Sequence, residues 1–308
     1  MKIVFMGTPA FAVPSLKILM DNGYDIVAVI TSADKYGGRG MKKLIESPVK
    51  KFALQHGLKV LQPRNLKAPE FVQELKSLNA DLQVVVAFRM LPEVVWNMPP
   101  LGTYNLHGSL LPQYRGAAPI NWAIINGEKH TGVTFFKLKH EIDTGAILLQ
   151  KEIPIGDDET AGELHDKMML IGADVVLEGV NMINAGDIVL KEQDNSKASK
   201  APKLYPDICK INWSKNVDDI YNFIRGLSPY PSAWTVLDEK KLKVLKAIKE
   251  HKKHSYKPGT VLTDNKKYFK VAVPEGIIDI SEVKAEGKKQ MDIKSFLNGN
   301  KIKTEILQ

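Results

Sequence analysis

Apolar and polar residues follow one another in blocks along the first hundred residues. Four short runs are almost continuously apolar, and the segments between them place apolar residues at helical spacing. The apolar runs are residues 2–7, 24–31, 59–63 and 81–88, and the helical segments are residues 9–23, 46–57 and 68–79. Continuous apolar strands that alternate with helices are typical of a parallel sheet covered on both faces. We therefore predict an α/β fold with a Rossmann-like, mostly parallel sheet and flanking helices, whose ligands bind at the carboxyl ends of the strands.

The pattern changes after residue 190. Up to that point strand-like and helical segments continue to alternate, and they end in a long amphipathic helix at residues 160–186. Residues 191–205 are polar and without periodicity, which predicts a linker. Beyond them, short strands separated by turn residues predict a small β-barrel. We expect a catalytic domain at residues 1–190 and a second domain at residues 206–308.

The excess of basic charge lies in the second domain. The net charge of the chain is +8, and residues 201–308 hold 21 Lys/Arg and 13 Asp/Glu, so they account for the whole excess. A neutral body beside a basic module suggests a polyanionic partner. A lysine-rich solvated surface would give the same excess, so charge alone leaves both interpretations open.

Composition argues against several classes of protein. The single cysteine, Cys209, allows no internal disulfide and no Cys-rich metal site, and it fits a reducing, cytoplasmic setting. No apolar run approaches the length that spans a bilayer, and Pro9 and Pro14 interrupt the N-terminus, which favours a buried strand over a signal peptide. The turn at Gly7 lacks the further glycines of a dinucleotide fingerprint, which argues against NAD binding.

A polar pair lies within the apolar stretch YNLHGSLLPQYRG at residues 104–116. Asn105 and His107 are two residues apart, so an extended strand points both to one face and turns Tyr104 and Leu106 to the other. A buried histidine bound to a backbone carbonyl would explain His107 alone. Two polar side chains on one core face each need partners, which raises the weight of a functional site.

Asp143 is the third polar residue that could carry chemistry. It precedes a Thr-Gly pair, where an aspartate is first of all a turn former. If the fold brings it to His107, the carboxylate, the imidazole and the Asn105 amide would suit acyl transfer, with a donor for an oxyanion and a pair that moves a proton. Ser109 lacks the G-x-S-x-G elbow of a serine nucleophile, and no His/Asp/Glu cluster has the spacing of a metal site.

Residues 34–51 form a glycine-rich basic segment after the second predicted strand. Six Lys/Arg surround three glycines, and Asp34 and Glu46 are the only acidic residues. Such a segment could reach a phosphate backbone, or it could be a flexible surface loop. The residues alone leave both interpretations open.

Two of these motifs together resemble a known family. YNLHGSLLPQYRGAAPI at residues 104–120, followed by IDTGAIL at residues 142–148, closely resembles the folate-dependent formyltransferases, in which an N-x-H-x-S-L-L-P stretch and a downstream aspartate surround the formyl group. MKIVFMGTPAFAVPSL, GRGMKKLIESPVK and SPYPSAWT are similar to the members that act on an aminoacylated tRNA. The resemblance covers almost the whole chain and implies that the C-terminal domain is an OB-like β-barrel.

The resemblance also implies a role for each matching residue. Asn105, His107 and Asp143 match the catalytic residues. The residues that it implies for folate binding are Phe88, Arg89, Leu91, Ser109, Leu110, Leu111 and Pro112. The residues that it implies for tRNA binding are Arg39, Lys42 and Lys43. Phe88 and Arg89 stand where the family commonly has Tyr and Gly, which leaves the role of the Arg89 side chain open.

From this resemblance we expect transfer of a formyl group from 10-formyltetrahydrofolate to the α-amine of methionine esterified to initiator tRNA. The enzyme would be a cytoplasmic monomer that needs no metal and no membrane. A small amine, such as glycinamide ribonucleotide or an amino sugar, is the alternative acceptor. Hydrolysis of the formyl donor and non-catalytic RNA binding on the same fold are further alternatives, and the intact set of Asn105, His107 and Asp143 argues against the last.

Overall fold

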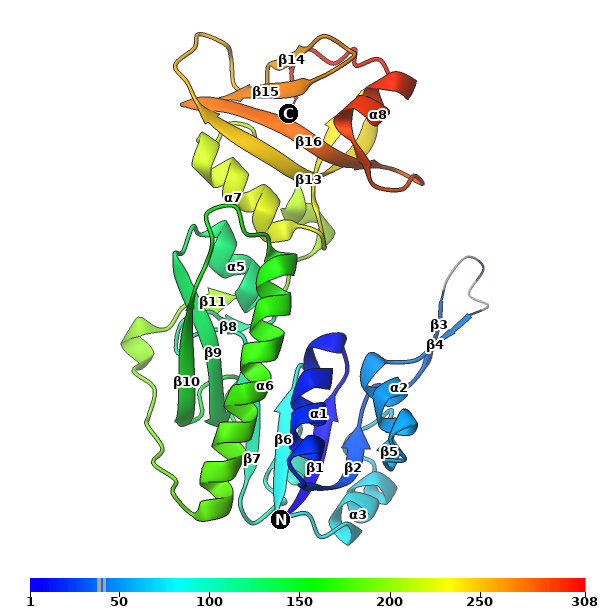
Figure 1. Ribbon diagram of the computed structural model, residues 1–308, viewed down its shortest axis with the longest axis vertical. Helices are drawn as coiled ribbons and strands as arrows, with labels where there is room; N and C mark the ends of the chain where they lie inside the picture. The colour runs from blue at the N-terminus through cyan, green and yellow to red at the C-terminus, as the bar shows by residue number, and fades with distance from the viewer. Residues whose placement is uncertain (38–39, 41–42, 308) are drawn as a thin grey trace. The chain divides into compact units, whose positions relative to one another are not determined.

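The computed structural model describes residues 1–37, 40 and 43–307. The chain divides into two compact units, each assembled from three separate stretches of sequence (Figure 1). The first unit comprises Met1–Gly116, Gly132–Ile153 and His165–Lys200, and the second comprises Ala117–Thr131, Pro154–Leu164 and Ala201–Gln308. The units therefore interleave along the sequence, whereas the boundaries predicted near residues 190 and 206 are single cuts.

The first unit is built on the predicted α/β sheet. Among the described residues this sheet has seven strands in the order β10-β9-β7-β6-β1-β2-β5. Their bounds are β1 Lys2–Gly7, β2 Asp25–Ile30, β5 Val60–Leu61, β6 Leu82–Val86, β7 Thr103–His107, β9 His130–Lys137 and β10 Ile147–Pro154. The pairs that join β5, β2, β1, β6 and β7 are all parallel, and β9 runs antiparallel to β7. The prediction of a mostly parallel sheet is confirmed.

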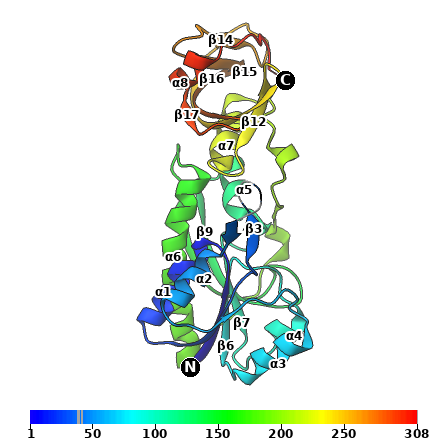
Figure 2. The ribbon, with the colours of Figure 1, turned by 90° about the vertical axis from the view of Figure 1, so that its right-hand side faces the viewer.

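Helices cover both faces of this sheet. Figure 2 shows α1, α2 and α6 on one face and α3 and α4 on the other. Their bounds are α1 Val13–Asp21, α2 Pro48–Gln55, α3 Pro69–Ser77, α4 Glu93–Trp96 and α6 Ala161–Ala185, and a short 3₁₀ turn, η1, spans Ala10–Ala12. Val4 and Met6 of β1 pack against Phe71 and Leu75 of α3 in one apolar cluster. Burial on both faces is the reason why β1 and β6 read as continuous apolar runs.

α6 is the one helix in the described part of the chain that is long and apolar enough to cross a membrane by length and composition. The prediction that no apolar run has this length was therefore wrong. The helix lies close against the sheet, because a side chain at Gly172 would meet Leu106 of β7 at 2.7 Å and one at Gly179 would meet Phe135 of β9 at 2.4 Å. A core helix meets the same composition test when its inner face is apolar.

Two small sheets were not predicted from the sequence. β3 (Lys35–Gly37) and β4 (Lys43–Ile45) form an antiparallel hairpin where the sequence indicated only a basic loop. β8 (Arg115–Gly116) pairs with β11 (Lys200–Ala201), so the segment predicted as a linker lies along the end of the motif at residues 104–116. A 3₁₀ turn, η3, spans Asn195–Lys197 within that segment.

The second unit carries an antiparallel sheet curled into a half-barrel, consistent with the OB-like β-barrel that was predicted (Figure 1). In the described residues the strand order is β12-β13-β16-β15-β14, with β17 paired to β16. The strands are β12 Ala233–Leu237, β13 Lys240–His251, β14 Val261–Thr263, β15 Phe269–Val273, β16 Gly276–Ala285 and β17 Met291–Asp292. The helices are α5 Pro119–Ile125, α7 Val217–Leu227, α8 Ile293–Gly299 and the 3₁₀ turn η4 Pro206–Cys209.

Part of this second unit comes from the N-terminal half of the chain. Ile125 of α5 packs against the apolar core that α7 shares with the curled sheet. The Asn121 side chain donates a hydrogen bond to the carbonyl of Gly226 at 2.8 Å. A side chain at Gly226 would meet Ile125 at 2.7 Å, so α5 and α7 approach closely because this residue is glycine. The core of the unit is therefore not a product of the C-terminal third alone.

Candidate active site

Strand β7 directs Asn105 and His107 to one face of the sheet and Leu106 to the other, as their spacing predicts. Leu106 points to Gly172 of α6, so Asn105 and His107 take the opposite face of the sheet. Asn105 is half-buried, and its carboxamide makes no hydrogen bond with any described residue. An amide donor is therefore left unused beside the imidazole.

The imidazole of His107 is held in one orientation. The residue is only 6% exposed, and Nε2 lies 2.9 Å from the carbonyl oxygen of Tyr114. Because a carbonyl oxygen can only accept, Nε2 carries the proton, and Nδ1 keeps its lone pair in the neutral ring. Nδ1 is therefore the atom that can take up a proton.

Asp143 lies on the Nδ1 side of this ring. Its Oδ2 is 3.8 Å from Nδ1 of His107, which is beyond direct hydrogen-bond distance and within reach of an ion pair or of one bridging water. The same oxygen accepts a hydrogen bond from the N–H of Gly116 at 2.9 Å. Asp143 has a φ of 54°, a left-handed conformation that aspartate tolerates in turns. Asp143 is thus both a turn residue and the carboxylate that faces His107.

The segment predicted as a linker holds the Asp143 turn in place. Nε2 of Gln193 donates to the carbonyls of Asp143 and Gly145 at 2.9 and 2.7 Å. Oε1 of Gln193 accepts from the guanidinium of Arg115 at 2.6 and 3.1 Å. Sequence reasoning missed Gln193 and Arg115, because contacts between a side chain and a distant backbone leave no periodic signal.

The stretch from Ser109 to Pro112 forms a fixed turn after the polar pair. Thr134 of β9 donates to the carbonyl of Ser109 at 2.6 Å and accepts from the N–H of Leu111 at 3.0 Å. Gln150 of β10 donates to the carbonyl of Leu111 at 2.9 Å. Two neighbouring strands therefore fix the backbone of this turn, and neither Thr134 nor Gln150 was identified from the sequence.

The side chains of this turn differ in their exposure. Leu111 is buried in a small cluster with Phe136 and Ile147. Leu110 and Pro112 are half-buried. The Ser109 hydroxyl is fully buried and donates to the carbonyl of Gln113 at 2.6 Å. A hydroxyl that is already engaged in this way is a poor nucleophile.

The loop after β6 carries the other residues predicted for the folate. Phe88 is half-buried against an apolar cluster that also contains Leu91. Arg89 is exposed and donates to the carbonyls of Arg64 and Pro63, so it ties this loop to the loop that follows β5. That contact answers the question of the Arg89 side chain, which here supports the backbone of a neighbouring loop.

Of the residues predicted for tRNA binding, Lys43 is the one that the structure describes. Arg39 and Lys42 lie outside the described residues. Lys43 is exposed at the start of β4, where it pairs in register with Gly37. The position of Lys43 on a hairpin that is separate from the main sheet is compatible with contact to a large ligand.

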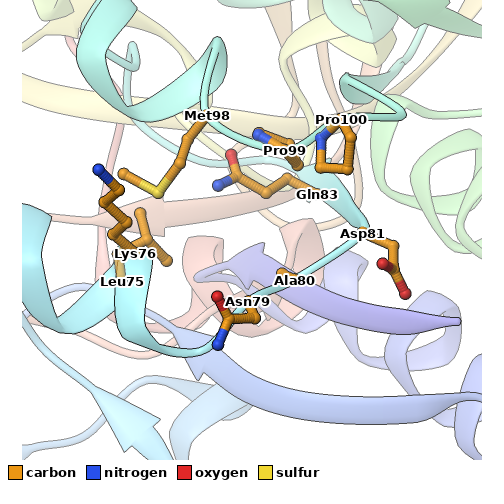
Figure 3. Close-up of a pocket in the computed structure, with 9 residues that line it drawn as sticks. All are labelled: Leu75, Lys76, Asn79, Ala80, Asp81, Gln83, Met98, Pro99 and Pro100. Atoms are coloured by element: carbon orange, nitrogen blue, oxygen red, sulfur yellow. The ribbon is translucent and has the colours of Figure 1, made fainter.

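A pocket of about 350 Å³ lies away from these residues, at the amino ends of β6 and β7 (Figure 3). Its wall includes Gln83, Lys76, Asp81 and Met98, and none of the predicted site residues lines it. Gln83 is 1% exposed, and its Oε1 accepts a hydrogen bond from Thr103 at 2.9 Å. Parallel sheets bind ligands at the carboxyl ends of their strands, so we place the candidate site at Asn105 and His107 and not in this pocket.

An unused amide donor, an imidazole with a free Nδ1 and a carboxylate beside it can stabilise an oxyanion and move one proton. This chemistry, on an α/β sheet that is joined to an OB-like unit, is that of an enzyme that transfers an acyl or formyl group. The family comparison agrees with this class: a formyl transferase model matches residues 1–179, and a model of the formyl transferase C-terminal domain matches residues 203–301. The chain belongs to the formyl transferase family.

Similar proteins extend over nearly the whole chain. A protein of Parabacteroides distasonis named methionyl-tRNA formyltransferase is 51% identical over 311 residues, which cover 98% of this chain and 96% of that protein. A protein of Flavobacterium psychrophilum with the same name is 52% identical over 305 residues, which cover 97% and 96%.

A solved structure with the same architecture supports the fold. An N-formyltransferase from Helicobacter canadensis, in complex with folinic acid and dTDP-3-aminofucose, matches with a TM-score of 0.70 and 23% identity, over 91% of this chain and 98% of that one. At 23% identity the match supports the fold of this chain and gives no information about its formyl acceptor.

Proposed function

We propose that the protein transfers a formyl group from 10-formyltetrahydrofolate to the α-amine of methionine esterified to initiator tRNA. The observation that carries this proposal is the identity of 51% and 52% to relatives named methionyl-tRNA formyltransferase, over almost the entire chain. The basic C-terminal stretch supports a polyanionic acceptor, since residues 201–308 carry all of the excess positive charge.

The geometry suggests how the reaction proceeds. The uncharged amine attacks the formyl carbon, and the carboxamide of Asn105 donates a hydrogen bond to the oxygen that becomes negative. Nδ1 of His107 receives the amine proton, and the Asp143 carboxylate at 3.8 Å stabilises the resulting imidazolium. The tetrahedral intermediate then collapses: the C=O bond re-forms, the bond between the formyl carbon and N10 breaks, and the imidazolium of His107 returns the proton to N10. The formyl group stays on the amine.

The folate would lie between two loops. The loop at residues 88–91 makes no backbone–backbone hydrogen bond among the described residues, so its N–H and C=O groups are open to a heterocycle with several donors and acceptors. Leu110 and Pro112, both half-buried, supply apolar surface on the turn after His107. We assign Phe88, Arg89, Leu91 and residues 109–112 to this binding site, with Arg89 in a supporting role.

The proposal extends to the setting of the enzyme. We infer that it works in the cytoplasm as a monomer, without a metal or a membrane partner. The catalytic domain would correspond to residues 1–190, the linker to 191–205 and the tRNA-binding domain to 206–308, with Arg39, Lys42 and Lys43 also on the tRNA.

An assay with charged initiator tRNA tests the proposal. Formylmethionine should form rapidly on charged initiator tRNA, more slowly on charged elongator tRNA and not detectably on free methionine. Formyl transfer to the tRNA should also fall steeply with salt, because phosphate contacts release counterions. Equal transfer to a small amine would instead favour the alternative acceptor, and loss of the formyl group to water at the same rate with and without tRNA would favour hydrolysis.

A further inference from the structure

A polar cluster at the base of the β3–β4 hairpin is not used by the chemistry above. Nζ of Lys50 pairs with the carboxylate of Asp34 and, at 2.8 Å, with that of Glu46. Asp34 immediately precedes β3, and Glu46 immediately follows β4. One ammonium group therefore contacts both ends of the hairpin, before β3 and after β4.

This cluster is well shielded from water and its hydrogen bonds are satisfied. The side chains of Lys50 and Asp34 are 14% and 18% exposed. The second oxygen of Asp34 accepts from Nε2 of Gln62 at 2.8 Å, and the same amide nitrogen donates to the carbonyl of Ser32 at 2.8 Å. Lys50 holds the pKa of Asp34 below its usual range, and Asp34 in turn raises the pKa of Lys50, so both are charged at neutral pH.

Lys50 stands where a helix disfavours a positive charge. It lies in the first turn of α2, whose N-cap Ser47 accepts a hydrogen bond from the N–H of Lys50 at 3.0 Å. The start of a helix carries partial positive charge, and this position commonly holds a carboxylate that completes the cap. A residue that breaks a local rule points to another role, and here that role is the contact with Asp34 and Glu46.

The hairpin needs such a support. Its two strands pair only with each other in the described part of the chain, and Figure 1 shows them projecting from the first unit beyond the start of α2. Tyr36 and Ile45 are 64% and 53% exposed, so no apolar core fixes the direction of the hairpin. An isolated two-stranded hairpin is at best marginally stable in water.

We propose that Lys50 is a positioning residue that clamps both ends of the β3–β4 hairpin, at Asp34 and Glu46, and thereby presents Lys35 and Lys43 of its strands to the phosphate backbone of the acceptor in one orientation. The proposal rests on the proposed function, because a small amine would need no such hairpin. Lys50 also offsets one of the two negative charges of Asp34 and Glu46, the only acidic residues of the basic segment, and so weakens their repulsion of a polyanion.

The test compares Lys50→Met with Lys51→Met in the full chain. Lys51 is the next residue on α2, is exposed and makes no ion pair with the described residues, so its substitution removes the same charge without touching the clamp. Hydrogen exchange at Lys35–Gly37 and Lys43–Ile45 should accelerate about tenfold in Lys50→Met and not in Lys51→Met. The KM for charged initiator tRNA should rise about tenfold in Lys50→Met and at most about twofold in Lys51→Met, with the KM for the formyl donor unchanged in both.

A third variant separates positioning from general damage. Lys50→Arg should restore most of the affinity for tRNA, because a guanidinium can still bridge two carboxylates. If Lys50→Met matches Lys51→Met in both exchange and KM, the clamp is overturned. If exchange rises while the KM for tRNA stays constant, its role toward the acceptor is overturned. Failure of the unmodified protein to formylate the tRNA would instead reject the proposed function, and the exchange rates would still decide whether the clamp exists.

Discussion

At the scale of single residues, the environment of Asn105 is unusual for a strand in the middle of a sheet. Its carboxamide is half-buried and makes no hydrogen bond with the described residues. A carboxamide that bonds to no described residue adds no hydrogen bond to the folded state, so folding does not explain this residue. The proposed catalytic role would explain it, because an oxyanion donor must be free until the substrate arrives.

Asn105→Ala should therefore lower kcat without lowering stability. The loss of one oxyanion donor is expected to reduce kcat by about 100- to 1,000-fold. The midpoint of thermal unfolding should stay the same or rise, since no hydrogen bond to a described residue is removed. Single-turnover kinetics and calorimetry on the same preparations give both numbers. A variant that is almost fully active would remove Asn105 from the mechanism.

Asp143→Asn separates the charge of this residue from its role in the turn. The amide oxygen can still accept from the N–H of Gly116, so the turn should persist, while the charge that faces Nδ1 of His107 is lost. We expect kcat to fall by about 100-fold or more, with little change in the KM for tRNA. The measurement is the rate of formyl transfer at saturating substrates, with Asp143→Ala as the variant that loses both functions. A fall in kcat of less than about threefold for Asp143→Asn would contradict the role of the charge.

At the scale of elements, α6 can pack close to the sheet because small residues line its inner face. A Cβ at Gly179 would lie 2.4 Å from the buried ring of Phe135, whereas a Cβ at Gly172 would meet the movable end of Leu106 at 2.7 Å. Alanine is otherwise favoured over glycine within a helix by about 1 kcal/mol. Whether such a substitution stabilises the protein is therefore decided by the neighbour and not by helix propensity.

Gly179→Ala should destabilise the protein by about 1–3 kcal/mol, because the Phe135 ring is fully buried and has no room to move. Gly172→Ala should cost clearly less, because the end of a leucine side chain can change rotamer. Denaturant unfolding of both variants measures the two free energies. The close packing described here would be refuted if Gly179→Ala were more stable than the unmodified protein.

The elements that could be predicted from the sequence are those whose burial repeats along the chain. β1, β2, β6 and α1–α3 were all indicated by apolar runs or helical spacing, and the structure confirms them. The β3–β4 hairpin was missed because its strands are exposed and carry no apolar pattern. α8, β8 and β11 were also missed.

The candidate site could also be predicted only in part: the residues of strand β7 could, and their partners from distant segments could not. The spacing of Asn105 and His107 placed both on one face, which the strand confirms. The partners that hold their surroundings, Thr134 and Gln193, act through hydrogen bonds to the backbone of residues far away in sequence. Such contacts depend on the finished fold, so no local pattern indicated them.

At the scale of the whole molecule, the second unit depends on chain segments that lie before α6 or form its first turn. Besides α5, it includes residues 154–164, which contact α7 through polar groups. The hydroxyl of Tyr221 donates to Asp158 at 2.6 Å, and burial is the main cause that raises the pKa of Tyr221. A fragment that begins near residue 205 would lack these partners, so point substitutions test the second unit more cleanly than truncation.

Arg225 provides that test. It is 5% exposed, and its guanidinium donates to the carbonyls of Glu159 at 2.9 Å and Gly156 at 3.2 Å and to the side chain of Asn222 at 2.8 Å. Arg225→Met keeps much of the apolar stem but removes these donors, and should destabilise the second unit by about 2–4 kcal/mol. Arg225→Lys should recover little, because one ammonium cannot reproduce the planar fork.

The matched variant is Tyr221→Phe, which keeps the ring in the core and removes only the hydroxyl that binds Asp158. It should cost about 1.5–3 kcal/mol, the range for a hydrogen bond to a charged group. Tryptophan fluorescence reports mainly the unfolding of this unit, because three of the four tryptophans lie in it and Trp213 is 2% exposed in its core. If both variants unfold within about 0.5 kcal/mol of the unmodified protein, residues 154–164 do not stabilise the second unit. If both lose stability as expected, the OB-like unit requires segments from both halves of the chain, and its limits cannot be drawn as one cut in the sequence.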